Sequence, residues 1–210
     1  MTKLGVLASG RGSNFHALIE AQKRGNFSAA FTVLISDQAN AGALSVAREN
    51  GIRAIAISPK DFPSREAHEG AVVKELENSG VELVCLAGYM RIVSAPLINR
   101  FRNKILNIHP ALLPAFPGLH GQKQALLHGA KVSGATVHFV DEGCDTGPII
   151  LQAAVPVEEN DTEESLSARI LREEHRIYPQ AVHLYCEGRL KIEGRRVHIL
   201  PPGQKKEESI

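Results

Sequence analysis

The chain has few of the features that mark secreted, membrane-bound or nucleic-acid-binding proteins. Its three cysteines are an odd number without a closely spaced pair, which favours reduced thiols and argues against a disulfide framework or a zinc site. No apolar run approaches transmembrane length, and the first one, residues 4–8, is too short for the core of a signal peptide. Basic residues do not cluster among aromatic ones. We therefore expect a cytoplasmic protein with no metal, no membrane partner and no nucleic-acid partner.

The bulk composition predicts one soluble globular domain. Of the 210 residues, 43% are hydrophobic and 22% are charged, and 24 basic against 23 acidic side chains leave a net charge of +1. A chain of this length buries roughly two-thirds of its unfolded surface and needs no disulfide or metal for support. We expect residues 1–200 to form a single domain and the polar residues 201–210 to form a disordered tail.

The first half of the chain repeats a strand–helix unit. Apolar runs rich in Val and Ile alternate with helical patterns, and these helices are expected to end at Gly25, Gly51 and Gly80, which act as C-caps. Such runs are typical of strands that are buried on both faces of a parallel sheet. Right-handed crossovers then give an α/β fold with a doubly wound, mostly parallel, Rossmann-like sheet. The predicted strands are residues 4–8, 31–35, 52–57 and 81–87.

The second half of the chain changes character. Residues 105–108 form a short apolar run before a proline-rich loop, and two further strands are predicted at residues 135–140 and 149–157. A long amphipathic helix is expected after Asp161 or Thr162, either of which can cap it. A short hairpin, residues 190–192 with 197–200, is predicted before the tail.

A glycine-rich turn, SGRGSN at residues 9–14, links the first predicted strand to the first helix. Such a turn exposes backbone N–H groups at a helix N-terminus and favours an anion. The dinucleotide fingerprint requires a small residue at its third glycine position, where this chain has Phe15, whose ring opposes close helix–strand packing. The turn therefore favours a phosphate monoester over a dinucleotide, with a plain tight turn as the alternative.

Asn107 and His109 lie at the end of the apolar run that starts at residue 105. Because they are two residues apart on an extended segment, their side chains point to the same side. Open α/β sheets bind ligands beyond the carboxyl ends of their strands, where this pair lies. An amide and an imidazole in that place can donate hydrogen bonds to an oxyanion. The alternative is a purely structural histidine before Pro110.

An acidic, glycine-bearing loop at residues 141–148 follows the predicted strand that contains His138. A carboxylate from this loop beside His109 would keep the imidazole protonated, with a pKa raised above its usual value of about 6.5. Such a pair suits general acid–base work, and the alternative is a solvated acidic turn. Cys144 lies in the same loop, but nothing around it marks the thiol as an activated nucleophile.

Five segments together resemble the formyltetrahydrofolate-using formyltransferases. They are GRGSN at 10–14, AGYMR at 87–91, NIHP at 107–110 with LLP at 112–114, VHF at 137–139 with the loop to Asp145, and EHRIYP at 174–179. They cover nearly the whole chain in the expected order. The resemblance implies transfer of a formyl group from 10-formyltetrahydrofolate to the amine of 5-phosphoribosylglycinamide in purine synthesis. It implies small-molecule substrates and a monomer or homodimer.

The resemblance also implies a catalytic trio, Asn107, His109 and Asp145. Asn107 and protonated His109 would stabilise the oxyanion that forms when the amine attacks the formyl carbon, and Asp145 would keep His109 charged. The N-terminal half of the chain would then form the phosphate-binding units, and the C-terminal half would be catalytic and folate-binding. The residues expected to line the folate site are Arg65, Met90, Arg91, Ile92, Val93, Asn107, Val140, Asp141 and Asp145.

The phosphorylated substrate is implied to bind at the first turn. Its phosphate would be held by Gly12, Ser13 and Asn14, and Glu174 would contact its ribose. Arg11 stands where some members of the family carry a neutral residue, and its charge could add a phosphate contact.

Three rival activities fit parts of the pattern. A formyltetrahydrofolate hydrolase would use water as acceptor, and such relatives usually carry a regulatory domain before the first strand. A methionyl-tRNA formyltransferase carries an RNA-binding domain after the shared core. This chain starts at the first strand and its final residues are few and nearly neutral, so we expect neither. A non-catalytic nucleotide-binding Rossmann module is disfavoured by Phe15 and by the catalytic trio.

Overall fold

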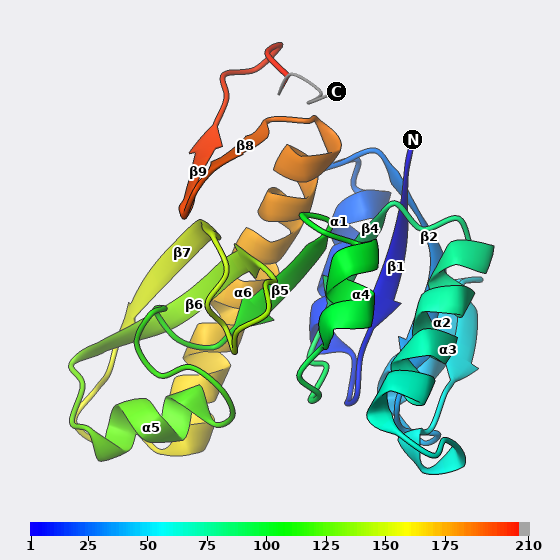
Figure 1. Ribbon diagram of the computed structural model, residues 1–210. Coiled ribbons are helices and arrows are strands. Elements are labelled where there is room, and N and C mark those ends of the chain that lie inside the picture. Colours follow the sequence, from blue (N-terminus) through cyan, green and yellow to red (C-terminus); the bar gives the residue numbers. More distant parts are fainter. Residues whose placement is uncertain (206–210) are drawn as a thin grey trace.

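The computed structural model describes residues 1–205 and builds them around one nine-stranded sheet (Figure 1). The strands are β1 (Thr2–Leu7), β2 (Ala29–Ser36), β3 (Arg53–Ala56), β4 (Leu83–Leu86), β5 (Ile105–His109), β6 (Val132–Phe139), β7 (Ile149–Pro156), β8 (Leu190–Glu193) and β9 (Arg196–Ile199). Their order in the sheet is β3-β2-β1-β4-β5-β6-β7-β9-β8. The chain winds outward from β1 in one direction and then continues from β4 in the other, so β1 and β4 flank the switch point of a doubly wound sheet.

Helices cover both faces of this sheet. They are α1 (Ser13–Lys23), α2 (Gly42–Glu49), α3 (Arg65–Asn78), α4 (Ala95–Arg100), α5 (Gly121–Leu127) and α6 (Glu163–Cys186), with a short 3-10 turn η1 (Pro59–Asp61). Buried side chains of α1, α2 and α6 form one core cluster with the sheet, and those of α3 and α4 form a second. Phe15 is fully buried in the first cluster. Its ring packs edge-to-face with that of Phe31, with 5.5 Å between the ring centroids. The large ring at the third glycine position is therefore a core residue.

The first half of the chain confirms the predicted strand–helix repeats. β1 pairs in parallel with β2 and β4, and the outer pairs β2–β3 and β4–β5 are parallel too. Gly25, Gly51 and Gly80 follow α1, α2 and α3 with φ angles of 78°, 68° and 63°. This left-handed conformation is the one that a glycine C-cap adopts without a Cβ penalty.

The second half confirms the predicted strands, hairpin and long helix but adds antiparallel pairing. β5 pairs antiparallel with β6, and β6 with β7, while β9 lies parallel to β7 and antiparallel to β8. The helices α4 and α5 were not predicted. They span only six and seven residues, too short for a helical period to stand out from its surroundings.

Helix α6 packs against one face of the sheet. Thr162 caps it, as predicted, because its Oγ1 accepts a hydrogen bond of 3.2 Å from the Ser165 N–H. Further along, the buried Tyr178 hydroxyl lies 2.9 Å from the carbonyl oxygen of Leu86 and 3.1 Å from that of Leu106. Those carbonyls belong to β4 and β5, so α6 is fixed against the two strands that end at the predicted site.

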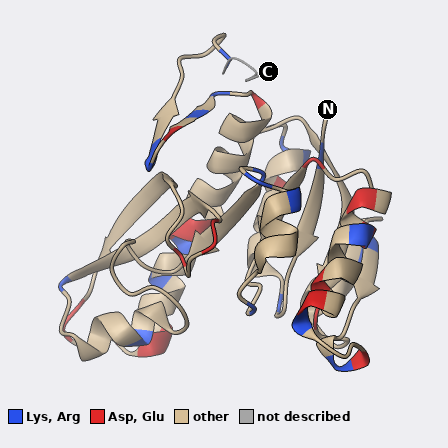
Figure 2. Cartoon of the chain, in the orientation of Figure 1, with Lys and Arg blue, Asp and Glu red and all other residues tan. Residues whose placement is uncertain are grey.

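The remaining described features concern the surface and the chain end. In the view of Figure 2, acidic and basic residues are interspersed over helices and loops, while the central strands carry few charges. Within residues 1–205, no helix is both long and apolar enough to cross a membrane. Residues 201–205 include a turn in which the Gln204 N–H donates to the Pro201 carbonyl oxygen. The rest of the predicted disordered tail, residues 206–210, lies outside the described residues.

Candidate functional site

The predicted site segments meet beyond the carboxyl ends of β1, β4 and β5. The Ser9 N–H, just after β1, donates to the Gly88 carbonyl oxygen at 3.0 Å. The Ser9 hydroxyl accepts a 2.9 Å hydrogen bond from the Met90 N–H, just after β4. The glycine-rich turn and the loop at residues 88–93 are therefore tied together, at the edge where open α/β sheets bind their ligands.

The glycine-rich turn depends on Gly12 at the N-cap of α1. Gly12 has a φ of 84°, and no side chain caps this helix end. A Cβ at this position would lie 2.7 Å from the Ala43 Cα, in the first turn of α2. The Ala43 N–H in turn donates to the Gly10 carbonyl oxygen at 3.1 Å. The turn is packed on α2 so closely that only glycine fits, and the first N–H groups of α1 stay available to an anion.

Asn14 and Glu174 are brought into direct contact across the α1–α6 interface. The Asn14 Nδ2 donates a 2.7 Å hydrogen bond to the Glu174 Oε2, and both side chains are buried. Within residues 1–205, the Asn14 Oδ1 has no hydrogen-bond partner. Burial raises the pKa of Glu174, and the hydrogen bond from Asn14 offsets part of that rise. The two predicted substrate residues thus form one polar group beneath the glycine-rich turn.

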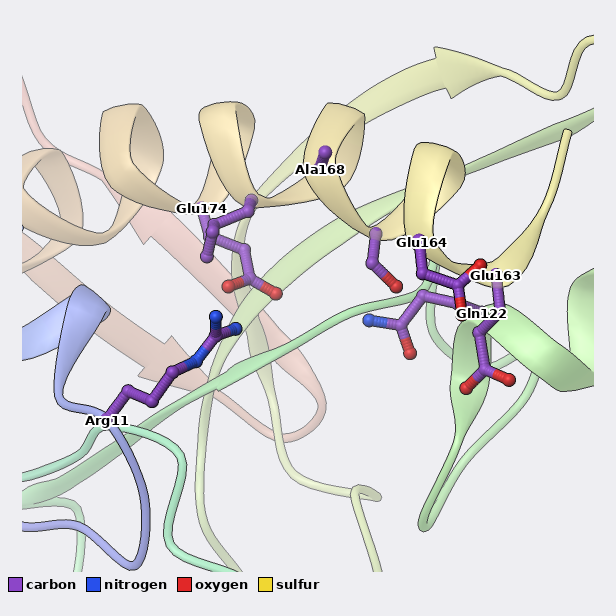
Figure 3. A pocket seen from close by; sticks show the side chains of 8 residues that line it. Arg11, Gln122, Glu163, Glu164, Ala168 and Glu174 are labelled. Atoms are coloured by element: carbon purple, nitrogen blue, oxygen red, sulfur yellow. The ribbon is translucent and has the colours of Figure 1, made fainter. Parts of the chain in front are cut away.

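A cavity of about 560 Å³ opens between this turn and the first half of α6. Figure 3 shows Arg11 reaching from the turn toward Glu174 on α6. The cavity is lined by Arg11, Gln122, Glu163, Glu164, Ser167, Ala168, Leu171 and Glu174. Its volume lies within the range of pockets that hold small-molecule ligands, roughly 300–1,000 Å³.

The trio Asn107, His109 and Asp145 comes together with His138. The His109 Nδ1 lies 3.3 Å from the Asp145 Oδ2, and the Asn107 Nδ2 donates to the Asp145 Oδ1 at 3.3 Å. The Asn107 Nδ2 also lies 3.2 Å from the His138 Nε2, because Asn107 faces His138 in the β5–β6 register. The three residues therefore lie together, as the sequence predicted, and His138 is a fourth member of the group that was not predicted.

His109 does not have the raised pKa that the sequence suggested. Its Nε2 lies 2.8 Å from the Phe116 carbonyl oxygen, so both ring nitrogens face acceptors. The side chain is only 4% exposed. Burial lowers the pKa of His109 below its usual value, and Asp145 and the Phe116 carbonyl offset this only in part. The expectation of a raised pKa was wrong because it counted the carboxylate and not the desolvation.

Asp145 is held from several sides and stays ionised. Its Oδ2 accepts a 2.8 Å hydrogen bond from the Gly118 N–H, and its backbone has a φ of 54°, unusual for a residue with a Cβ. Burial alone would raise the pKa of Asp145, but His138, His109 and the Gly118 N–H outweigh it and lower the pKa to about 2. The loop therefore presents a fixed negative charge to His109.

Arg65 is held in place near the 88–93 loop. Its Nη2 donates to the Ile92 carbonyl oxygen, and its Nε lies 3.3 Å from the Oε1 of the buried Glu69. Met90 and Ile92, by contrast, are 63% and 60% exposed. A held cation beside two exposed apolar side chains suits a flat apolar ligand that carries carboxylates.

The other predicted folate residues differ in what their side chains reach. Val93 is buried in the second core cluster, and Val140 packs against that cluster. The Asp141 carboxylate is turned into its own loop, where its Oδ1 accepts from the Thr146 hydroxyl at 2.6 Å and from the Gly143 N–H at 3.2 Å. Arg91 is half-buried near Tyr89. Of these four, only Arg91 has a side chain suited to a ligand contact, and the others shape the loops.

Sequence reasoning missed four groups at the site. His138 was noted only as part of a strand, and nothing local reveals that it faces Asn107 across two antiparallel strands. The Phe116 carbonyl and the Gly118 N–H are backbone groups, which carry no sequence signal. The contact of Glu69 with Arg65 could have been predicted, since the two residues lie four apart on one face of a helix. Within residues 1–205, no group of three or more His, Cys, Asp or Glu side chains is arranged to hold a metal ion.

Comparison with known proteins places this geometry in a family. The profile of the formyl transferase family matches residues 2–182. A trifunctional purine biosynthetic protein adenosine-3 of Drosophila pseudoobscura pseudoobscura is 48% identical over 90% of the chain, which spans only 14% of that protein's length. A phosphoribosylglycinamide formyltransferase of Bacillus subtilis is 44% identical over 87% of this chain and 93% of its own.

A solved structure gives the same result in three dimensions. Glycinamide ribonucleotide transformylase 1 from Symbiobacterium toebii is 56% identical and superimposes with a TM-score of 0.95, over 96% of this chain and 95% of its own. The sequence match therefore runs from the first strand into the long helix, and the structural match covers nearly the whole chain. The chain belongs to the formyl transferase family.

Proposed function

We propose that the chain transfers the formyl group of 10-formyltetrahydrofolate to the amine of 5-phosphoribosylglycinamide, a step of purine synthesis. The observation that carries the proposal is the contact of Asn107, His109 and Asp145 at the carboxyl edge of the sheet, together with a glycine-rich turn that leaves the N-terminus of α1 without a side-chain cap. The names of the relatives from Bacillus subtilis and Symbiobacterium toebii support the same acceptor and the same transferred group.

The glycine-rich turn and α6 form the proposed acceptor site. The N–H groups of Gly12, Ser13 and Asn14 would bind the phosphate at the N-terminus of α1, where the helix dipole favours an anion. Arg11 lines the adjoining cavity and adds a positive charge. Glu174 is a buried acceptor that the Asn14 amide holds in place, which suits a ribose hydroxyl.

The 88–93 loop and α3 form the proposed donor site. The exposed side chains of Met90 and Ile92 offer an apolar wall, and the guanidinium groups of Arg65 and Arg91 offer charge for carboxylates. The loop at residues 140–145 would form the opposite wall through its backbone. These residues fit a ligand with an apolar ring system and an acidic end, as a folate has.

The catalytic trio would act on the formyl group that the donor supplies as electrophile. Asn107 would donate a hydrogen bond to the oxygen on which charge develops, and one such donor is worth about 3 kcal/mol of barrier. Charged His109 would stabilise the same oxygen through its positive charge, while its ring nitrogens keep their contacts with Asp145 and the Phe116 carbonyl. The contacts of the Asn107 Nδ2 with His138 and Asp145, at 3.2 and 3.3 Å, are long for hydrogen bonds. Long contacts of this kind are common in catalytic sites before substrate binds. Asp145 would orient His109 and stabilise its charged form. It would also help to move the proton that the attacking amine loses to the departing folate nitrogen, as the bond between that nitrogen and the formyl carbon breaks and tetrahydrofolate leaves.

The proposal is tested by the dependence of donor consumption on the acceptor. Absorbance of the donor would be followed with 10-formyltetrahydrofolate alone and after addition of 5-phosphoribosylglycinamide. We expect consumption only when the amine is present, and none with the His109→Ala variant. Equal consumption with and without the amine would replace the transferase by a hydrolase, and tight NAD binding without any consumption would favour a non-catalytic module.

A further inference from the structure

One loop supplies the backbone groups that orient both His109 and Asp145. The Phe116 carbonyl oxygen lies 2.8 Å from the His109 Nε2, and the Gly118 N–H donates to the Asp145 Oδ2 at 2.8 Å. Both groups belong to residues 110–118, which form most of the segment that joins β5 to α5. Any shift of this loop would therefore change the hydrogen bonds of two proposed catalytic side chains at once.

The loop holds Phe116 in a conformation that a bulky residue avoids. Its φ is 56°, in the left-handed region, where the Cβ of an L-residue is crowded by its own backbone. Such a conformation persists only where the surrounding structure imposes it. The contacts that hold the loop are therefore part of what aims the Phe116 carbonyl at His109.

Gln152 on β7 provides one of these contacts. Its Nε2 donates to the Leu113 carbonyl oxygen at 2.8 Å and to the Thr136 Oγ1 at 3.0 Å, so both amide protons are used. The Thr136 hydroxyl, opposite Gln152 in the β6–β7 register, donates to the Ala111 carbonyl oxygen at 2.6 Å and accepts from the Leu113 N–H at 3.1 Å. Gln152 therefore completes a hydrogen-bonded polar group that fastens the start of the loop.

The far end of the loop is fastened from α5. The Gln124 Nε2 donates to the Pro117 carbonyl oxygen at 3.1 Å and to the Leu119 carbonyl oxygen at 2.9 Å. Phe116 and Gly118 thus lie between two glutamine side chains, each of which binds loop carbonyls. Gln152 differs from Gln124 in that it also bonds to Thr136 on β6. That strand carries His138 and pairs with β5.

We infer that Gln152 is a positioning residue for the reaction, which fixes the 110–118 loop so that its Phe116 carbonyl and Gly118 N–H orient His109 and Asp145. The inference rests on the proposed function and extends it to a side chain that contacts none of the proposed ligand-binding residues. Three groups face His109: Asp145 from its loop, His138 from β6 and the Phe116 carbonyl. The Phe116 carbonyl favours the charged ring, so its loss should lower the pKa of His109.

The test compares Gln152→Met with Gln22→Met. Gln152 is exposed on β7, so its replacement leaves the core intact. Gln22 is a matched control, because its Nε2 likewise donates to a backbone carbonyl, that of Ala29 at the start of β2, at 3.1 Å, away from the site. Three quantities would be measured: kcat, the KM of each substrate, and the NMR titration of the His109 ring, with the resonance assigned from His109→Ala.

We expect Gln152→Met to lower kcat by about tenfold or more, since small misplacements of catalytic groups are costly, with both KM values changed by less than about twofold. The His109 midpoint should move to lower pH, and Gln22→Met should leave kcat and the midpoint unchanged. A wild-type kcat and midpoint in Gln152→Met would overturn the inference, as would an equal loss of kcat in Gln22→Met. Because the titration requires no turnover, it decides the inference even if the proposed reaction fails.

Discussion

At the scale of single residues, the chemistry depends on how His109 is balanced between burial and its two acceptors. Asp145 and the Phe116 carbonyl each favour a doubly protonated ring, while near-complete burial opposes the charge and prevails. A lowered pKa makes the charged imidazole a stronger acid, which suits a group that must give a proton or a short hydrogen bond to a developing oxyanion. Asp145, ionised above pH values of about 2, supplies the charge that keeps this state within reach.

The first prediction concerns the coupling of His109 and Asp145. His109→Ala and Asp145→Ala should each lower kcat by about a hundredfold or more while the protein stays folded, because each removes a group that acts on the developing charge. Since the two side chains act as one unit, the double variant should lose much less than the product of the two single losses. Steady-state kinetics with circular dichroism as the folding check measures this, and fully multiplicative losses would separate the two roles.

The second prediction concerns the titration of His109 in the unliganded protein. Its NMR midpoint should lie below the usual value of about 6.5, because burial disfavours the charged ring. Asp145 raises that pKa, so Asp145→Asn should move the midpoint lower still, and the ring charge should then be lost earlier as pH climbs. Asn tolerates the left-handed backbone of position 145 and keeps its shape. A midpoint above 6.5, or one that Asp145→Asn leaves unmoved, would contradict this account of the pair.

At the scale of elements, the glycine-rich turn is fixed by its contact with α2 rather than by its own sequence. Gly12 approaches Ala43 so closely that a Cβ has no room, and the backbone hydrogen bond from Ala43 to Gly10 holds the same contact. The turn is also tied to the 88–93 loop through Ser9. One short segment therefore connects the proposed acceptor site with the proposed donor site.

The third prediction separates crowding at this turn from backbone strain. Gly12→Ala should raise the KM for 5-phosphoribosylglycinamide by about tenfold or more, because a Cβ 2.7 Å from the Ala43 Cα must displace the phosphate-binding N–H groups. The KM for the donor should change little. Gly25→Ala is the matched control, since Gly25 has a φ of 78° but open space around a Cβ. If Gly25→Ala raises the acceptor KM as much, general strain and not the turn geometry is responsible.

The parallel half of the sheet was predictable because its signals are local. Apolar runs and the glycines at positions 25, 51 and 80 mark strands and helix ends within a few residues, and the structure places them there. The antiparallel pairing of β5 with β6 was not predictable in the same way. It depends on a register that brings Asn107 opposite His138, which only the folded sheet defines.

In the candidate site, too, the side chains with reactive groups could be predicted from the sequence, and the contacts that depend on the folded structure could not. The side chains of Asn107, His109 and Asp145 carry chemistry that a sequence displays, and their grouping was predicted. The Phe116 carbonyl, the Gly118 N–H and the Gln152 amide act through hydrogen bonds that depend on tertiary structure. The direction of the His109 pKa shift was mispredicted for the same reason, since the degree of burial is a property of the whole fold.

At the scale of the whole molecule, the two proposed sites share one edge of the sheet. The glycine-rich turn and α6 line one cavity, and the 88–93 loop with α3 contributes the other proposed ligand surface. β5 ends in His109 at this edge. Such an arrangement brings two bound ligands together at one pair of strand ends, and positioning of this kind can supply several kcal/mol of rate acceleration.

The measurement that tests the central claim most directly is the fate of a labelled formyl carbon. The protein would be incubated with 10-formyltetrahydrofolate that carries carbon-13 in its formyl group and with 5-phosphoribosylglycinamide, and the products separated by mass. The account predicts that the label appears on the amine of the phosphorylated acceptor, and that His109→Ala abolishes this transfer. Label recovered as free formate in the presence of the acceptor, with none on the amine, would contradict it.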